Sequence, residues 1–221
     1  MPRSHRNSES ILVIGLGRFG GTLALELERL GNEVLGVDAD ARPVQLYSTR
    51  LTKTLQSDTT DAEALRQLGV VDFDHVVVGI GDVEASILTT TELIELGVTD
   101  IWAKAVTEAH ARILTSVGAS HVVRPEHDMG QRVAHRVTGK MIDFIELDTS
   151  FALVETVAPA SLCGVPLAQA NIRQQHDVTV VCIKPVGGSF TYATPDTVIK
   201  ADDILLVAGQ TTSVERFSLL E

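Results

Sequence analysis

The stretch ILVIGLGRFGGTLALELERLGNEVLGVDAD, residues 11–40, predicts a strand, a glycine-rich turn, a helix and a second strand. In this order Gly15 permits a tight turn, Gly17 lets a phosphate approach the backbone, and Gly20 allows the helix to pack closely on the first strand. The N-terminus of the helix offers unpaired N–H groups to an anion. Asp38 follows the second strand, about twenty residues beyond the first glycine, where a carboxylate accepts hydrogen bonds from ribose hydroxyls. The stretch therefore predicts a nucleotide site on a dinucleotide-binding fold.

Strand and helix signals continue to alternate as far as Pro125. Further strands are predicted at 53–56, 75–80, 101–104 and 121–124, and helices between them at 61–68, 83–96 and 108–117. Six strands that alternate with helices specify a Rossmann-like α/β fold with a doubly wound parallel sheet. The ligand of such a sheet belongs at the carboxyl ends of its strands.

The pattern changes after Pro125. Residues 127–147 carry apolar side chains at roughly helical spacing, with Gly139 as an expected break, and this predicts a connecting helical arm. Beyond it, strands are expected at 152–157, 178–183, 190–192 and 204–207, and helices at 167–174 and 211–219. We therefore divide the chain into a flexible tail (1–9), a nucleotide-binding domain (10–125), a helical linker arm (126–147) and a small α+β C-terminal lobe (148–221).

Composition limits the class of protein. The 221 residues are 44% hydrophobic, which is sufficient for a substantial core. A formal net charge of -11 repels a phosphate backbone, so no nucleic-acid partner is expected. Cys163 and Cys182 form no CxxC pair and are interpreted as small buried residues. No apolar run approaches the roughly 20 residues that cross a bilayer, and residues 1–10 contain no signal-peptide core, so we expect a cytoplasmic protein.

Catalytic groups do not accompany the nucleotide motif. A dehydrogenase presents an acid/base residue and a substrate pocket to the nicotinamide, and the small strand-rich lobe offers no recognisable set of this kind. The seven histidines have no convincing zinc spacing, and there is no GxSxG turn. We therefore expect a binding protein without enzymatic activity.

The motifs also carry a specific resemblance. GLGRFGGTLALELERLG with VDAD, then IWAKA and RPEHDMG, is similar to the cytosolic regulatory subunits of Ktr/Trk potassium uptake systems, the RCK (regulator of K+ conductance) family; NIR and ADDILLVAG extend the similarity through the C-terminal lobe. This resemblance implies a nucleotide-sensing subunit that is not an enzyme. It also implies homodimers that assemble into an octameric ring beneath a membrane channel subunit, at the cytoplasmic face of the cell membrane. In many such subunits the C-terminal lobe binds cyclic di-AMP.

The resemblance and side-chain chemistry together suggest roles for residues near the glycine loop. Arg18, at the helix N-terminus, would favour the terminal phosphates of ATP or ADP over the diphosphate bridge of NAD(H); the alternative role is that of a surface arginine. Asp40 either assists Asp38 or caps the next helix. Ser57 and Asp58 either edge the adenine or form a plain turn. The candidate nucleotide-binding residues are Gly15, Gly17, Arg18, Phe19, Gly20, Asp38, Asp40, Ser57, Asp58, Gly79 and Gly81.

Two further sites follow from the resemblance. Glu126 matches a glutamate that approaches the phosphates through a cation, and Mg2+ or Na+ would offset the repulsion between carboxylate and phosphate. Capping of the helix that starts there is the alternative role. In the C-terminal lobe, Ile172, Arg173 and Pro195 are candidates for a cyclic di-AMP site across a two-fold interface, with simple packing as the alternative for Ile172 and Pro195.

The favoured hypothesis is an ATP/ADP-sensing gating subunit of a potassium uptake channel, in which the two ligands bind differently to two conformations. A NAD(H)-binding redox sensor or oxidoreductase is the main alternative. A nucleotide-binding oligomerisation module without a channel is the third.

Overall fold

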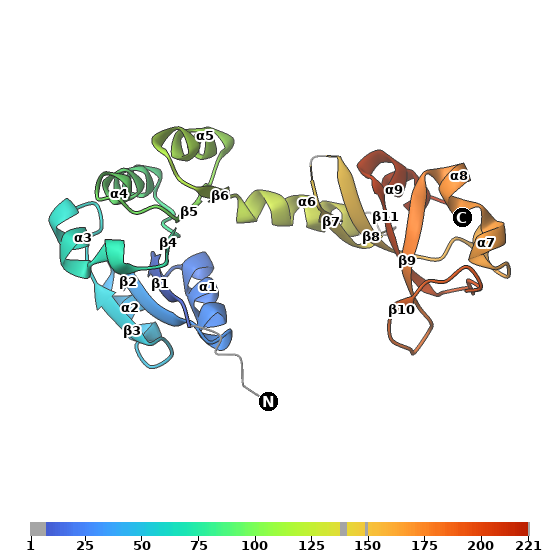
Figure 1. Cartoon of the computed structure of the whole chain (residues 1–221), viewed down its shortest axis with the longest axis horizontal. Coiled ribbons are helices and arrows are strands. Elements are labelled where there is room, and N and C mark those ends of the chain that lie inside the picture. Colours follow the sequence, from blue (N-terminus) through green and yellow to red (C-terminus); the bar gives the residue numbers. More distant parts are fainter. Residues whose placement is uncertain (1–7, 138–140, 149, 221) are drawn as a thin grey trace, which may run out of the picture. The chain divides into compact units, whose positions relative to one another are not determined.

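A computed structural model describes residues 8–137, 141–148 and 150–220. Residues 1–7 of the predicted tail and the predicted break at Gly139 lie outside these ranges. The chain divides into two compact units, Met1–Glu126 and His127–Glu221, which we describe separately (Figure 1). Within the described residues, none of the helices has the length and apolar composition needed to span a membrane.

The N-terminal unit is built on a parallel sheet of six strands in the order β3-β2-β1-β4-β5-β6. The strands are β1 (Ser10–Ile14), β2 (Glu33–Asp38), β3 (Lys53–Gln56), β4 (His75–Val78), β5 (Ile101–Lys104) and β6 (His121–Val123). The helices are α1 (Arg18–Arg29), α2 (Ala41–Tyr47), α3 (Ala62–Leu68), α4 (Val83–Glu95) and α5 (Glu108–Val117), with a 3-10 turn at Val70–Asp72. The predicted Rossmann-like, doubly wound fold is confirmed.

Both faces of this sheet are covered, because consecutive side chains of a strand point to opposite faces. On β1, Ile11 and Val13 join a core with Leu23 and Leu27 of α1. Leu12 and Ile14 face the other way and join a core with the buried side chains of α3, α4 and α5, namely Leu65, Leu93 and Leu114. The near-continuous apolar run of β1 follows from this double burial.

β1 pairs with β2 on one side and with β4 on the other. The chain adds β2 and β3 on the first side of β1 and then crosses to add β4, β5 and β6 on the second side. The connections after β1 and β4 therefore diverge and leave a crevice outside the carboxyl ends of these two strands. In open α/β sheets a ligand binds at this switch point.

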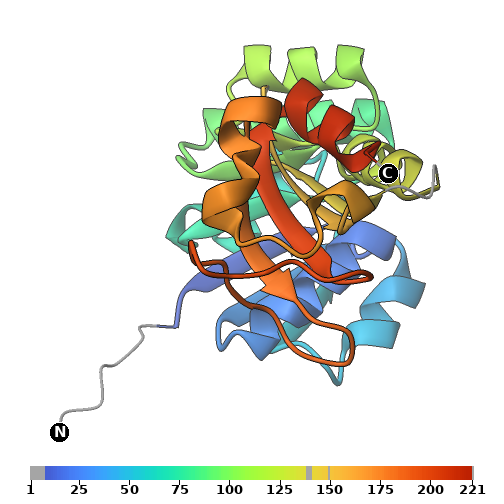
Figure 2. The same ribbon diagram turned by 90° about the vertical axis from the view of Figure 1, so that its right-hand side faces the viewer.

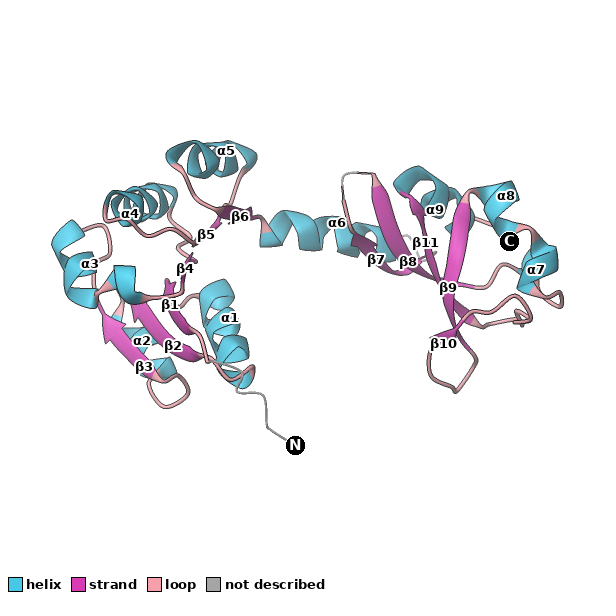
Figure 3. Cartoon of the chain, in the orientation of Figure 1, coloured by secondary structure: helices cyan, strands magenta, loops and turns pink. Residues whose placement is uncertain are grey.

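The C-terminal unit contains an antiparallel sheet in the order β10-β9-β11-β8-β7. Its strands are β7 (Met141–Glu146), β8 (Phe151–Val157), β9 (Val178–Lys184), β10 (Thr191–Tyr192) and β11 (Ile204–Gln210). The helices α7 (Leu167–Ala170), α8 (Ile172–His176) and α9 (Thr211–Ser218) and a 3-10 turn at Ala160–Leu162 complete it (Figures 2 and 3). Its core includes the buried side chains Val154, Ile199, Leu205 and Phe217. The predicted α+β lobe is confirmed.

The expected helical arm over 126–147 is wrong in its second half. The helix α6 (Pro125–Val137) is followed by the edge strand β7, in which Ile145 pairs with Leu153 of β8. A register irregularity between Met141 and Asp143 interrupts the two-residue alternation, so the apolar spacing of this strand imitates a helix. The β-branched and aromatic side chains nevertheless favour a strand once β8 is available for pairing.

The described C-terminal part of α6 is fastened to this strand. The Arg132 guanidinium forms a two-pronged ion pair with Asp143, with 2.6 Å between Nε and Oδ1. This ion pair holds the pKa of Asp143 below its usual range. His135 stacks on Phe144, with ring centroids 4.1 Å apart. The helix therefore packs with the C-terminal unit instead of standing as a separate arm.

The single helix expected at 167–174 is also wrong, because it consists of α7 and α8 joined at Asn171. Asn171 adopts a left-handed conformation, with φ 49°. Asparagine tolerates this conformation better than most residues, so the chain changes direction here without a glycine.

Candidate functional site

The turn between β1 and α1 depends on two glycines. Gly15 has φ 88°, and a Cβ added there would lie 2.9 Å from the backbone nitrogen of Ile80. A Cβ at Gly20 would lie 1.9 Å from the carbonyl oxygen of Gly15. Gly17 differs, because no atom of the described residues lies within 4 Å of an added Cβ. The first two glycines are therefore required by packing, whereas Gly17 leaves open space beside the backbone.

Gly17 is also the N-cap of α1, and no side chain among the described residues caps this helix. The first N–H groups of a helix have no partner within it. Together with the helix dipole they attract an anion. The beginning of α1 is thus an uncapped, positively polarised end beside open space.

Asp38 lies at the end of β2, and its carboxylate is held by the backbone. Oδ2 accepts a hydrogen bond of 2.7 Å from the N–H of Leu16, and Oδ1 accepts one of 2.9 Å from the N–H of Asp40. A carboxylate has about four acceptor positions, so both oxygens can still accept bonds from a ligand. The two backbone bonds fix the orientation in which they do so.

These groups surround a cavity of about 250 Å³ at the switch point. Six of the predicted residues line it: Gly15, Gly17, Asp38, Asp58, Gly79 and Gly81. The other lining residues are Ile14, Ala39, Thr59, Thr60, Ile80 and Ala85. Its size and mixed lining suit part of a nucleotide, while the phosphate end would extend over the open side at Gly17.

The remaining predicted residues lie outside this lining. Asp40 caps α2 through the N–H of Arg42 and pairs with the Arg42 guanidinium at 3.3 Å, contacts that lower its pKa. Ser57 donates its backbone N–H to the Asp38 carbonyl. Arg18 is exposed on the first turn of α1, next to half-buried Phe19.

Sequence reasoning missed Thr59 and Thr60. Thr60 donates both its N–H and its hydroxyl to Asp58 Oδ1, at 3.0 and 2.7 Å, and these bonds lower the pKa of Asp58. The buried hydroxyl of Thr59 lies 3.1 Å from that of Thr89 on α4. The Asp-x-Thr spacing immediately after a strand was the available signal, because it favours a side-chain-stabilised turn.

A third missed residue is Lys104, which ends β5. Its side chain is 9% exposed, its Nζ lies 3.5 Å from Glu126 Oε1, and it sits 6.0 Å from the ring centroid of Phe19. His110 of α5 is buried nearby, and burial, assisted by the Lys104 charge, lowers its pKa. The structure therefore gathers Phe19, Lys104 and Glu126, which are far apart in sequence.

Glu126 is the predicted cation ligand. Among the described residues, no group of three or more His, Cys, Asp or Glu side chains is placed to hold a metal ion. Its carboxylate is 63% exposed and has Lys104 as its charged partner. Mg2+ is commonly bound by one or two carboxylates together with substrate phosphates and water, so the single exposed carboxylate of Glu126 would fit such an ion only together with a bound phosphate.

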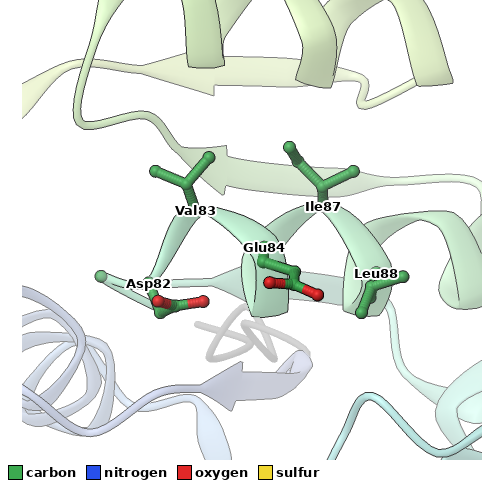
Figure 4. A pocket seen from close by; sticks show the side chains of 6 residues that line it. Asp82, Val83, Glu84, Ile87 and Leu88 are labelled. Carbon is green, nitrogen blue, oxygen red and sulfur yellow. The ribbon is translucent and has the colours of Figure 1, made fainter.

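A shallower hollow adjoins the cavity at Gly81 and follows the first turns of α4 (Figure 4). Asp82 caps this helix by accepting from the N–H of Ala85 at 2.9 Å. Val83 and Ile87 project from one side of the helix, and Asp82 points away from them (Figure 4). This hollow is mainly apolar and lacks the backbone donors of the glycine loop.

In the C-terminal unit, Ile172, Arg173 and Pro195 line one pocket of about 480 Å³. Arg173 is exposed and donates from Nε to Thr179 Oγ1 at 3.1 Å, whereas Ile172 is buried. The pocket also contains Leu167, Ala168, Asn171, Gln174, Val178, Thr179, Val180, Ala193 and Thr194.

Comparison with known proteins finds two domain models and several relatives that match most of the chain. The TrkA-N domain matches residues 11–125 and the TrkA-C domain matches residues 151–220. Ktr system potassium uptake protein C of Bacillus subtilis is 41% identical over 93% of this chain and 94% of its own length. Ktr system potassium uptake protein A of the same organism is 34% identical over 95% of this chain and 96% of its own.

Solved structures share the fold. The GsuK RCK domain has a TM-score of 0.66 at 19% identity and covers all of this chain, which spans 48% of that protein. A GsuK channel bound to NAD has a TM-score of 0.54 at 21% identity and covers 96% of this chain and 38% of its own. A Kef C-terminal domain of Shewanella denitrificans in an AMP-bound form has a TM-score of 0.53 at 18% identity and covers 59% of this chain and 79% of its own. With a TrkA-N domain followed by a TrkA-C domain and these relatives, the chain belongs to the Ktr/Trk family of RCK-domain proteins.

Proposed function

We propose that this protein is a nucleotide-sensing regulatory subunit of a potassium uptake system, and that it acts by binding instead of catalysis. The observation that carries the proposal is the cavity at the switch point, with Asp38 held beside an uncapped helix, in a chain whose relatives are potassium uptake proteins. The protein would act in the cytoplasm, at the inner face of the membrane that holds the channel subunit.

The proposed ligands are ATP and ADP. Asp38 accepts hydrogen bonds from the ribose hydroxyls, and the cavity wall that contains Asp58 and Thr60 lies along the edge of the adenine. The phosphates lie at the N-terminus of α1. Arg18 in that first turn and the Lys104 ammonium beside Phe19 supply positive charge for terminal phosphates. A nucleotide that ends in a phosphate gains more from these charges than NAD(H), whose two phosphates lie in the interior of the molecule.

Glu126 would join this site through Mg2+ or Na+. Without nucleotide its carboxylate is partnered by Lys104 at 3.5 Å. A bound cation would supply positive charge between Glu126 and the terminal phosphate. Lys104 would then pair with the phosphates instead of Glu126. ATP and ADP would then differ in affinity between two conformations, which is the condition for a ligand to shift a conformational equilibrium.

Assembly is the second part of the proposal: a homodimer that forms an octameric ring on the membrane channel subunit. Support comes from α6, where Met129, Val133 and Val137 recur every four residues and are 53%, 44% and 79% exposed. Such a stripe occupies one face of a helix and is commonly buried in an assembly. Light scattering at micromolar concentration, with and without ATP, should therefore report a dimer or a larger species. A monomer under both conditions would contradict the assembly.

The pocket of Ile172, Arg173 and Pro195 is the proposed cyclic di-AMP site. An apolar wall with an exposed guanidinium suits a ligand that has two adenines and two phosphates. Binding of cyclic di-AMP that survives Arg173→Ala would place that ligand elsewhere.

The ligand proposal is tested first by identifying the nucleotide that co-purifies with the protein, and then by calorimetry with ATP, ADP and NADH. ATP and ADP should bind at least as tightly as NADH, and Arg18→Ala should weaken ATP more than adenosine. Equal losses for ATP and adenosine would remove the phosphate role of Arg18. A clear preference for NADH would favour a redox sensor or oxidoreductase.

The cation role is tested with Glu126→Gln, which keeps the size of the side chain and removes its charge. In the unchanged protein Mg2+ or Na+ should strengthen ATP binding more than ADP binding. The variant should bind ATP nearly normally without the cation and lose the cation's enhancement. In liposomes with its channel subunit, it should also lose much of the ATP-driven increase in K+ flux. An unchanged cation response would leave Glu126 with only a structural role.

A further inference from the structure

Ionisable side chains also gather at the opposite end of the same sheet, where the strands begin. His75 is the first residue of β4, His121 is the first of β6, and Asp100 immediately precedes β5. Glu9 immediately precedes β1, so the four side chains come from four neighbouring strands. We call His75, Asp100, His121 and Glu9 the amino-edge cluster. It lies at the end of the strands remote from the nucleotide cavity and is unused by the proposed function.

The contacts in the amino-edge cluster form a chain across the sheet. Nδ1 of His75 forms a short hydrogen bond with Asp100 Oδ2, and its Nε2 lies 3.3 Å from Glu9 Oε2. The other oxygen of Asp100 lies 3.6 Å from His121 Nε2. Trp102, the single tryptophan of the chain, stacks on the His121 ring with centroids 4.0 Å apart.

Only the protonated form of His75 can donate from both ring nitrogens to both carboxylates. The hydrogen bond with Asp100 is the main reason why its pKa is raised above the usual 6.5, and partial burial opposes the rise. The ionisable groups around His75 are Asp100 before β5, Glu9 before β1, Asp74, its neighbour in the chain, and His121 on the other side of Asp100. Because the facing carboxylates outnumber the cation, loss of one proton changes the local balance from attraction to repulsion.

We propose that the amino-edge cluster is a pH-dependent link, in which protonated His75 bonds both to Glu9 before β1 and to Asp100 before β5, and in which deprotonation of His75 releases Glu9. Glu9, His75 and Trp102 also line an apolar hollow of about 420 Å³ that includes Phe19 and Leu23 of α1. Release of Glu9 therefore changes the lining of that hollow. A rise in pH breaks this link, because only the charged form of His75 bonds to both carboxylates.

The direction of the pH dependence follows from linkage between protonation and folding. A histidine whose pKa is higher in the folded state contributes stability that is complete below the pKa of the unfolded chain, about 6.5. This contribution is lost as the pH rises through the higher folded pKa of His75. The contribution of His75 to stability therefore falls between pH about 6.5 and its higher folded pKa, and it is absent at more alkaline pH.

The experiment combines imidazole NMR with urea unfolding of the full chain. In the unchanged protein the His75 resonance should titrate above the pH of a free histidine, and Asp100→Asn should lower that midpoint. The urea midpoint of the unchanged protein should exceed that of His75→Gln near pH 6, and the two should approach each other as the pH rises. His127→Gln, which removes an exposed histidine outside the cluster, is the matched control and should run parallel to the unchanged protein at every pH.

Two results would overturn the proposal. One is a His75 resonance that titrates at or below the position of a free histidine, which can be measured in the unchanged protein without any variant. The other is a constant difference in urea midpoint between the unchanged protein and His75→Gln across the pH range. Neither result depends on nucleotide binding or K+ transport, so failure here is distinct from failure of the proposed function.

Discussion

The two edges of the parallel sheet use polar groups in opposite ways. At the carboxyl edge, α1 begins without a side-chain cap, a cavity opens beside Gly17, and Asp38 keeps acceptor positions free. At the amino edge, polar side chains satisfy one another: Ser10 donates to Asp74, and His75 bonds to Asp100. One edge of the sheet therefore offers helix N–H groups and spare carboxylate positions to a ligand, whereas the side chains named at the other edge bond to one another. Unpaired donors and acceptors mark the end where a ligand can supply the missing partner.

The largest effect that would test this contrast is expected from Gly20→Ala. The new Cβ would lie 1.9 Å from the carbonyl oxygen of Gly15, a backbone atom of the turn that cannot move aside as a flexible side chain could. We expect the free energy of unfolding to fall by about 3 kcal/mol, near the upper part of the range for overpacking, and nucleotide binding to be lost.

Gly17→Ala is the matched control for that change. In the part of the chain that the structure describes, an added Cβ meets no atom within 4 Å, and the backbone of Gly17 has φ -67°, which alanine readily adopts. Urea unfolding of the two variants without ligand should therefore separate them clearly. Equal destabilisation by both alanines would show that the turn does not depend on the close contact of Gly20.

The second prediction concerns Asp38→Ala. The substitution removes the acceptor for the N–H groups of Leu16 and Asp40 and for the ribose. Affinity for every ribose-containing ligand should fall by about 1.5 to 3 kcal/mol, the range for hydrogen bonds to a charged group. Calorimetry with ATP and adenosine measures this loss, which should be similar for both ligands.

Asp40→Ala is the corresponding control, because Asp40 caps α2 and pairs with Arg42. This variant should be less stable and retain the affinity for adenosine. A loss of affinity equal to that of Asp38→Ala would mean that both carboxylates serve the ribose.

A smaller loss is expected from Thr60→Val, which keeps the shape of the side chain and removes its hydroxyl. Thr60 donates to Asp58 in the cavity wall, so this carboxylate would lose one of the bonds that orient it. Nucleotide affinity should fall by about 1 kcal/mol, as for one ordinary hydrogen bond. Thr22→Val removes a hydroxyl that bonds to the Arg18 carbonyl on the exposed side of α1, and it should leave the affinity unchanged if the cavity wall is what matters.

The smallest effect is expected at the amino edge, from Asp74→Ala. The N–H and hydroxyl of Ser10 lower the pKa of Asp74 by donating to it, so its contribution to stability is present above the unfolded value of about 3.9 and is lost as the pH falls through the folded pKa. The unfolding midpoints of the variant and the unchanged protein should differ slightly at neutral pH and converge in acid. Nucleotide affinity should not change; a marked loss would connect the two edges and weaken the contrast between them.

The N-terminal unit was predictable because its signals are local. The turn at Gly15, the uncapped helix and the acid after β2 all lie within the stretch 11–40, and the strands of a doubly covered parallel sheet are apolar runs with clear ends. Asp61 and Thr107 cap the helices that follow them, as their residue types suggest.

The errors of prediction have two causes, long-range contacts and a single residue in an unusual backbone conformation. Residues 141–146 have an apolar spacing that resembles a helix, yet they form β7 because β8 is there to pair with them. The break of the helix at Asn171 depends on one residue in a left-handed conformation, which the sequence permits without requiring it. Thr60 lines the cavity only because the turn after β3 reaches the switch point.

The sequence by itself determined the parallel Rossmann-like sheet, the position of the glycine loop and the acid at the end of β2, because each depends on residues close together in the chain. Only the tertiary structure decided that Lys104 faces Glu126 and that His75 and His121 share Asp100. The physical reason is that parallel pairing aligns the ends of strands distant in sequence, so which side chains meet at an edge depends on strand order and register.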